Sequence, residues 1–362
     1  MKKIMLISWD MSMLGGINQV VVTLANNLCT QYEVTVVSLV KSGERTPYSF
    51  SSSKTEVEYI MEKDCRGRSV ILEGRSKLRK LVRQKKIDVV FLMGFQVSLP
   101  AILMTMGQRC RYIFCDHEAL LSRWHEKKVT AVRYLTAVLS DKVVTLTRQN
   151  ALDYISRFKL SSKKVTHIYN SIDDKILSNA QEYNAQSKII LSVGRFSPEK
   201  QYDLLVEIAN SVLKKHSDWK WCIYGDGQTF PEIKEKISAL GLEEKILLKG
   251  EVSDVSTIYA QGALFVLTSQ REGLPLVLLE AKANHLPCIS FDIISGPKEI
   301  IQNNIDGFLI KPYDKEGMIR SIETLITDER LRIKMSENTG GNLEQFSNRE
   351  VMNKWKALID TI

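Results

Sequence analysis

The most constraining stretch of this chain is residues 263–281, where a buried-strand pattern passes through a tight loop into an apolar helical pattern. Pro275 suits the first helical position, because its missing N–H is not needed there. The free amides of Leu276 and Val277 then point out of the helix start, and Gly273 lets a ligand approach the backbone closely. The stretch therefore predicts an α/β unit with a phosphate or diphosphate site at the start of its helix.

Two carboxylates flank this predicted anion site. Glu272 precedes the helix and Glu280 lies about five residues into it, which separates them by about 7–8 Å along the helix axis. A ligand with a diphosphate in the middle and a hydroxyl-bearing ring at each end would satisfy both acids, and a nucleotide diphosphate sugar has that shape. The alternative is that Glu272 is an ordinary loop carboxylate and Glu280 a solvated helix residue.

The segment Glu272–Glu280 resembles the E-x7-E motif of retaining GT-B glycosyltransferases of the family four type, the glycosyl transferases group 1. The similarity covers nearly the whole chain and is strongest over residues 189–312. Residues 281–292 and 296–301 are also similar to the branch that builds bacterial surface polysaccharides. The resemblance implies an α/β fold of two doubly wound Rossmann-like domains facing a cleft, with the nucleotide sugar on the second domain and the acceptor on the first.

Length and composition agree with two soluble domains. The 362 residues exceed one small core, and 44% apolar with 25% charged residues is typical of a globular protein. We expect an acceptor domain at residues 1–172, a donor domain at 173–342 and a helix at 343–362 that packs back on the first domain. The N-terminal residues form a strand pattern rather than a signal peptide, and no apolar run could span a membrane. We expect a cytoplasmic protein, and peripheral attachment to the inner face of the cell membrane is compatible with this location.

Six scattered cysteines without a Cys-x-x-Cys pair indicate reduced thiols, and five isolated histidines lack metal-ligand spacing. We therefore predict no metal site and no cofactor besides the donor substrate.

A glycine pair follows the first predicted strand. Gly15 and Gly16 lie between the strand at residues 4–8 and an apolar helical pattern, as in phosphate-binding α/β domains. A Gly-Gly pair alone is more often only a turn, and no G-x-G-x-x-G is present to support a dinucleotide site. By resemblance, this loop faces the donor phosphates across the cleft.

His117 follows the predicted strand at residues 111–115, and the carboxyl ends of strands in open α/β sheets are where ligands bind. A histidine there is often only a hydrogen-bonded structural residue. By resemblance, His117 matches a histidine that contacts the donor sugar near its anomeric centre.

Arg195 and Lys200 follow the predicted strand that opens the second domain. A planar guanidinium and a point-charge ammonium can both bind a diphosphate, although two ordinary surface cations are the alternative. The segment resembles the family's G-R-x4-K pattern, which implies that the two cations neutralise the leaving group. The donor-contacting positions that follow from the motifs and the resemblance are Gly15, Gly16, Gly194, Gly225, Gly273, Leu274, Leu276, Val277 and Glu280, with Glu272, Arg195, Lys200 and His117 as catalytic residues.

The positive charge is confined to the first half of the chain. Residues 1–170 carry 27 Lys and Arg against 14 Asp and Glu, whereas residues 171–362 carry 23 against 28. A basic amphipathic segment at 66–86 concentrates the excess. It predicts either a solvated helix face or a contact with an anionic membrane. Nucleic acid is disfavoured, because no aromatic residues are interleaved and no recognition motif is present.

Together these features and the resemblance predict a retaining transferase of polysaccharide or glycan assembly. It would move a hexose or N-acetylhexosamine from a UDP-sugar to a saccharide acceptor, which we expect to be lipid-linked. Two rivals remain open from sequence. A glycosidase could use Glu272 and Glu280 as its two carboxylates. A non-catalytic GT-B-like subunit could bind a glycan or scaffold an active partner.

Overall fold

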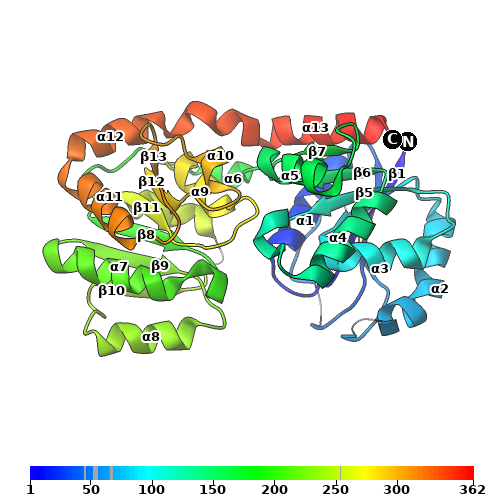
Figure 1. Cartoon of the computed structure of the whole chain (residues 1–362), viewed down its shortest axis with the longest axis horizontal. Helices are drawn as coiled ribbons and strands as arrows, with labels where there is room; N and C mark the ends of the chain where they lie inside the picture. Colours follow the sequence, from blue (N-terminus) through cyan, green and yellow to red (C-terminus); the bar gives the residue numbers. More distant parts are fainter. Residues whose placement is uncertain (45, 52–55, 66–67, 253) are drawn as a thin grey trace. The chain divides into compact units, whose positions relative to one another are not determined.

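The computed structural model describes residues 1–44, 46–51, 56–65, 68–252 and 254–362. The chain forms two compact units (Figure 1). Unit 1 comprises Met1–Asn170 together with Val351–Ile362, and unit 2 comprises Ser171–Glu350. Each unit is built on its own parallel sheet.

The sheet of unit 1 has seven strands in the order β3-β2-β1-β4-β5-β6-β7, and all its pairs are parallel. Its central strands are buried on both faces, which explains their unbroken apolar runs. The strands are β1 (Lys3–Ser8), β2 (Glu33–Ser38), β3 (Val57–Tyr59), β4 (Val89–Met93), β5 (Arg111–Asp116), β6 (Lys142–Thr145) and β7 (Val165–His167).

Helices cover both faces of this sheet. Met5, Ile7, Val90 and Leu92 pack in one core with the apolar sides of α2 and α3. Phe91, which points to the opposite face, packs on Trp355 of α13 with ring centroids 5.4 Å apart. The helices of unit 1 are α1 (Gly16–Leu28), α2 (Arg68–Lys85), α3 (Phe95–Thr105), η1 (Leu120–Arg123), α4 (Lys127–Leu139) and α5 (Arg148–Phe158), and α13 (Asn348–Asp360) returns to this unit from Val351 onward.

The sheet of unit 2 has six parallel strands in the order β10-β9-β8-β11-β12-β13. They are β8 (Ile189–Val193), β9 (Lys220–Tyr224), β10 (Ile246–Gly250), β11 (Leu264–Leu267), β12 (Cys288–Phe291) and β13 (Gly307–Ile310). The helices are α6 (Asp174–Ser178), η2 (Pro198–Lys200), α7 (Tyr202–Lys215), α8 (Phe230–Ala239), η3 (Val255–Thr257), η4 (Tyr259–Gln261), α9 (Leu276–Ala283), α10 (Pro297–Ile300), α11 (Lys315–Thr327), α12 (Glu329–Asn338) and η5 (Thr339–Phe346).

Both sheets reverse their strand order at one place, between β1 and β4 in unit 1 and between β8 and β11 in unit 2. The loops that leave the carboxyl ends of two such strands diverge to opposite faces and leave room for a ligand. The predicted Rossmann-like α/β architecture is therefore confirmed, and it locates a candidate site in each unit.

Two local predictions were wrong. Residues 343–362 are not one helix, because η5 ends at Phe346 and an extended Ser347 precedes α13. Pro275 is not the first helical residue but the N-cap, since its ψ of 100° is extended and α9 begins at Leu276.

Candidate functional site

In unit 2, two loops that follow neighbouring strands are joined by hydrogen bonds. The amide of Gln270 donates to the carbonyl oxygen of Glu199 at 2.9 Å. The hydroxyl of Thr268 donates to the carbonyl oxygen of Lys200 at 2.9 Å. These bonds tie the loop after β8 to the loop after β11, which is why residues about 70 positions apart in sequence meet here.

The result is an ion pair between two predicted site residues. Lys200 Nζ lies 2.6 Å from Glu272 Oε1, and the side chains are only 17% and 12% exposed. Arg195, on the same loop, is exposed and forms no ion pair within the described part of the chain. The structure thus brings Lys200 and Glu272 together and leaves Arg195 facing solvent.

Close backbone packing explains one of the predicted glycines, Gly225. Gly225 has a φ of +133°, and a Cβ there would lie 2.0 Å from the carbonyl oxygen of Gly194. The Gly194 amide donates to Tyr224 at 3.0 Å, and the Gly225 amide donates to Gly250 at 2.8 Å. No side chain fits at Gly225, so the fold requires glycine at this position whether or not a ligand binds.

The start of α9 is held by the segment that follows β12. Ser295 Oγ donates to the carbonyl oxygen of Gly273 at 3.2 Å. Gly296 has a φ of +103°, and a Cβ there would lie 2.6 Å from Cδ of Pro275. The amides of Leu276 and Val277 lie in the first turn of the helix, where no helical carbonyl group precedes them to accept their hydrogen bonds. Leu274, by contrast, is 5% exposed, so its side chain packs inside the unit.

Glu280 is held by a tyrosine that the sequence analysis missed. Tyr259 is fully buried, and its hydroxyl donates to Glu280 Oε2 at 2.6 Å. Burial raises the pKa of Glu280, and the charge of Asp173 raises it further, whereas the Tyr259 hydrogen bond lowers it. Within the described residues, only the Oε2 atom of this carboxylate accepts a side-chain hydrogen bond. A tyrosine in a polar, turn-rich segment gave no sequence signal of this role.

A buried ion pair anchors the far side of α9. Lys282 Nζ lies 2.7 Å from Asp306 Oδ2, and neither side chain is exposed. The ammonium also donates to the Ile300 carbonyl oxygen at 2.7 Å and to Asn342 Oδ1 at 2.6 Å. All three ammonium protons therefore have acceptors, and the network fixes the helix that carries Glu280.

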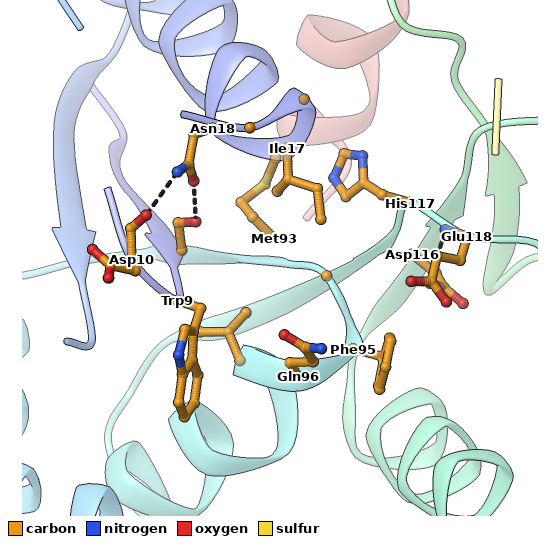
Figure 2. Close-up of a pocket in the computed structure, with 15 residues that line it drawn as sticks. Trp9, Asp10, Ile17, Asn18, Met93, Phe95, Gln96, Asp116, His117 and Glu118 are labelled. Carbon is orange, nitrogen blue, oxygen red and sulfur yellow. Dashed lines mark hydrogen bonds between the residues drawn. The ribbon is translucent and has the colours of Figure 1, made fainter. Parts of the chain in front are cut away.

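Unit 1 has a cavity of about 280 Å³ at the reversal point of its own sheet (Figure 2). The loops after β1, β4 and β5 line it. Gly15 and Gly16 lie on its wall, and a Cβ at either position would have no atom within 4 Å. These glycines are therefore not required by packing within the described structure, unlike Gly225, and the space beside them is open.

Asn18 organises this glycine loop, and the sequence analysis missed it. Its amide nitrogen donates to the carbonyl oxygens of Asp10 at 2.7 Å and Met13 at 2.8 Å. Its amide oxygen accepts from Ser8 Oγ at 2.7 Å. Figure 2 shows the Asn18 side chain pointing toward Asp10. A polar residue on the otherwise apolar side of α1 was the available signal, because such a residue is rarely buried unless it is fully hydrogen-bonded.

His117 lines the same cavity (Figure 2). Its Nε2 atom is buried and has no hydrogen-bond partner among the described residues. Burial lowers the pKa of His117 to about 4, so the ring is neutral near pH 7 and can offer or accept one hydrogen bond. A buried, unpartnered nitrogen at the edge of a cavity is what a ligand-contacting histidine would present.

Side chains of α4 and α5 form ion pairs and a hydrogen bond with the residues on either side of His117. Arg133 of α4 lies 3.2 Å from Asp116 Oδ2 and 2.9 Å from Glu118 Oε2. The hydroxyl of Tyr154 donates to the same Asp116 oxygen at 2.5 Å. Asp116 and Arg133 are both buried, so this network holds the backbone of the His117 loop rigidly.

Neither unit gathers a metal-binding group: no three His, Cys, Asp or Glu side chains within the described ranges are arranged to hold an ion. Likewise, every helix of the described structure falls short of the length and apolarity that crossing a bilayer requires.

Two family models match the chain. "Glycosyltransferase Family 4" matches residues 14–175, and "Glycosyl transferases group 1" matches residues 173–340. The chain is 29% identical to the amylovoran biosynthesis glycosyltransferase AmsD of Erwinia amylovora, over 99% of this chain and 100% of that protein. It is 26% identical, over 95% of each, to a Campylobacter jejuni enzyme named GalNAc-alpha-(1->4)-GalNAc-alpha-(1->3)-diNAcBac-PP-undecaprenol alpha-1,4-N-acetyl-D-galactosaminyltransferase.

A solved structure of TarM from S. aureus, in complex with fondaparinux, alpha-GlcNAc-glycerol and UDP, matches with a TM-score of 0.85 at 17% identity, over 99% of both chains. At this identity the likeness concerns the fold, and it confirms the predicted GT-B class.

Proposed function

Because the chain belongs to the glycosyltransferases, with a family 4 domain followed by a group 1 domain, we propose that it transfers a hexose or N-acetylhexosamine from a UDP-sugar to a saccharide carried on a lipid diphosphate, with retention of anomeric configuration. That it is a GT-B glycosyltransferase of glycan assembly follows from the family. The donor, the acceptor and the stereochemistry are the proposal.

The observation that carries the donor assignment is the Lys200–Glu272 pair beside the start of α9. A diphosphate at the amides of Leu276 and Val277 would lie near this ammonium, and Arg195 is free to approach from solvent. Glu280 keeps one carboxylate oxygen for the ribose hydroxyls, since Tyr259 occupies the other. Glu272 would accept from a hydroxyl of the sugar and fix its orientation.

The nature of the donor and acceptor is supported by the relatives. The Campylobacter enzyme's name gives an N-acetylhexosamine, an α-linkage and an undecaprenyl diphosphate acceptor. The TarM structure contains UDP and alpha-GlcNAc-glycerol. AmsD is named for the biosynthesis of amylovoran. These names favour a UDP-linked hexose or N-acetylhexosamine and a surface polysaccharide, a capsule among them, as the product.

In the proposed reaction, the bond between the anomeric carbon and the diphosphate oxygen breaks while the acceptor hydroxyl attacks the same face. Lys200, Arg195 and the helix start stabilise the charge that develops on the departing UDP. The departing phosphate oxygen takes the acceptor proton, so no protein base is assigned. These positive groups make a metal unnecessary in the proposal, and full activity in EDTA would be the expected result.

We assign three residues of unit 1 to the reacting end of the donor. Gly15 and Gly16 would let the diphosphate approach the backbone, since open space lies beside both. His117 would hydrogen-bond the sugar near its anomeric centre through its unpartnered Nε2. A neutral ring suits this role, because it can bind a hydroxyl without adding charge at the anomeric carbon.

Both rivals from the sequence lose support. The glycosidase loses support because both matching family models are models of glycosyltransferases. A non-catalytic scaffold would have no use for the Lys200–Glu272 pair beside an intact helix start.

We further propose that the protein is cytoplasmic and touches the inner face of the membrane through α2. The predicted basic segment 66–86 begins outside the described residues, at 66 and 67. Within α2, Arg79 and Arg83 are bound to Met106 and Gln108, but Arg75 and Lys80 are exposed and unpaired in the described structure. Their replacement by Gln should weaken binding to anionic vesicles if α2 is a contact.

The test is sugar transfer by the whole chain, measured as UDP release and as product with a panel of UDP-sugars and undecaprenyl-diphosphate saccharides. An α-linked product from an α-linked donor, seen by NMR, would support retention. UDP binding without transfer to any acceptor would support the scaffold alternative, and inversion would overturn the proposed stereochemistry.

A further inference from the structure

The C-terminal half of α4 in unit 1 exposes large apolar side chains and buries two polar side chains beside Ala137. The side chains on its exposed face include Tyr134, Leu135, Val138 and Leu139, which are 44–46% exposed. The buried face carries Arg133 and Thr136, both fully buried. On a water-soluble domain, a helix usually turns its large apolar side chains toward the core instead.

The inward face has a use that the structure explains, since Arg133 clamps Asp116 and Glu118 beside His117. The outward stripe has no such explanation. Four large apolar side chains at a spacing of three and four residues form one continuous strip, and strips of this kind mark an interaction surface rather than scattered exposed residues.

A groove beside the strip adds aromatic rings and positive charge. Its volume is about 750 Å³. The rings of Trp124 and Tyr134 both pack on Phe158, with centroids 5.9 Å and 5.3 Å apart. The guanidinium of Arg157 lies over the Trp124 ring at 5.6 Å. The groove is lined by Trp124, His125, Lys127, Thr130, Ala131, Tyr134, Arg157, Phe158 and Lys159.

The charge of this surface is positive. Glu126, the nearby acid, is held by Arg123 through two contacts of 2.6 Å. Lys127, Lys128 and Lys159 are exposed and have no acidic partner within the described residues. A second copy of this chain on a two-fold axis would place these lysines against one another, which disfavours self-association.

We propose that the α4–α5 surface, defined as the exposed face of α4 together with the groove at Trp124, Arg157 and Phe158, docks on an anionic phospholipid bilayer. The strip at Tyr134–Leu139 enters the boundary between head groups and acyl chains, and the groove receives a lipid phosphate. Tryptophan, tyrosine, lysine and arginine are the side chains that favour this boundary.

This surface is separate from the contact proposed for α2 and differs from it in chemistry. The exposed α2 cations offer charge alone, which high salt screens. The α4 strip adds apolar insertion, which salt leaves intact. The inference does not depend on the sugar chemistry, because vesicle binding needs neither donor nor acceptor.

The experiment is flotation of the full chain with vesicles of phosphatidylcholine, with and without phosphatidylglycerol. The chain should bind the anionic vesicles, and Leu135→Gln with Val138→Gln should lower the partition coefficient about tenfold or more. The matched control is Leu240→Gln with Ile305→Gln in unit 2, whose side chains are 42% and 49% exposed, and it should bind as the wild type does. Lys127→Gln with Lys128→Gln should weaken the dependence on phosphatidylglycerol, and the remaining dependence should come from Arg157, Lys159 and the α2 cations.

Insertion is measured separately by quenching of Trp124 fluorescence with lipids brominated in their acyl chains. A Trp124→Phe protein should lose the quenched component. Because the substituted side chains are exposed, thermal melts of all variants should coincide with the wild type. The inference is overturned if the wild type does not bind anionic vesicles. It is also overturned if Arg75→Gln with Lys80→Gln abolishes binding while the α4 substitutions have no effect. A change from dimer to monomer on α4 substitution, measured by light scattering, would likewise overturn it. Failure of sugar transfer with intact vesicle binding would instead count against the proposed function alone.

Discussion

Lys200 Nζ and Glu272 Oε1 are 2.6 Å apart, although 72 positions separate the two residues in sequence. Each belongs to a loop that leaves the sheet of unit 2 on either side of the β8–β11 reversal. Without ligand the two charges neutralise each other. A diphosphate that attracts Lys200 would free Glu272 to accept from a sugar hydroxyl, so one pair of residues could respond to both the leaving group and the transferred sugar.

Replacing Lys200 by Ala should lower the rate of sugar transfer by about 10²–10³-fold, because the departing diphosphate loses a preorganised positive charge. Initial rates of UDP release at saturating donor would measure it. Lys214→Ala is the control, since Lys214 is an exposed lysine of α7 outside the candidate site. Transfer at the wild-type rate by Lys200→Ala would remove Lys200 from the mechanism.

The glycines of the two units should respond differently to alanine. Gly15→Ala should fold with a free energy of unfolding within about 0.5 kcal/mol of the wild type, because its φ of 179° suits any residue and no atom lies within 4 Å. It should nevertheless reduce transfer. Gly225→Ala should lower the free energy of unfolding by about 1–3 kcal/mol, since its Cβ would clash with the Gly194 carbonyl oxygen. Urea unfolding beside transfer rates separates these outcomes, and equal stability losses would refute the distinction.

The stability of the protein should depend on pH through His117. Its pKa is about 4 in the folded chain against 6.5 for a free side chain. Between these values the unfolded chain binds a proton that the folded chain excludes. The free energy of unfolding should therefore fall as the pH drops from 6.5 toward 4, by up to about 3 kcal/mol.

Urea unfolding at several pH values tests this. His117→Gln should flatten that part of the profile, whereas His125→Gln, at an exposed histidine of the same unit, should keep it. An unchanged slope in His117→Gln would mean that another group carries the dependence.

Lys282→Met should destabilise unit 2 by about 3–5 kcal/mol, because it leaves the carboxylate of Asp306 buried without its partner. The second substitution Asp306→Leu, made in the same protein, should recover much of this loss, since the unpaired charge is then removed. Chemical unfolding measures both. The affinity for nucleotide should also fall in the single variant, because α9 is then held less firmly. A Lys282→Met protein as stable as the wild type would contradict the role assigned to the pair.

The sequence predicted the parallel architecture well because buried strands form short, unbroken apolar runs. The strand–loop–helix at residues 263–281 and the strand that opens unit 2 are both present as β11, α9 and β8. The three-residue β3 escaped prediction, since an edge strand so short carries no pattern. The helix predicted at 343–362 failed at Ser347, where no glycine or proline marks the break.

The charged motif residues could be predicted, but not their partners. Tyr259 contacts Glu280 only because η4 lies beside α9 in the folded unit, and Arg133 reaches Asp116 from a helix whose outward face looks like a core. Such contacts depend on tertiary packing, which the spacing of residues along the chain does not reveal. The roles of Arg195, Lys200, Glu272 and Glu280 toward a donor remain predictions.

The central claim is that the start of α9, with Lys200 beside it, holds a diphosphate between two carboxylates. A crystal structure of the protein soaked with UDP tests it most directly. The account predicts phosphate oxygens within hydrogen-bonding distance of the amides of Leu276 and Val277, Lys200 turned from Glu272 toward the diphosphate, and the ribose at Glu280. Phosphorus atoms bound elsewhere, or calorimetry that detects no uptake of UDP, would contradict it.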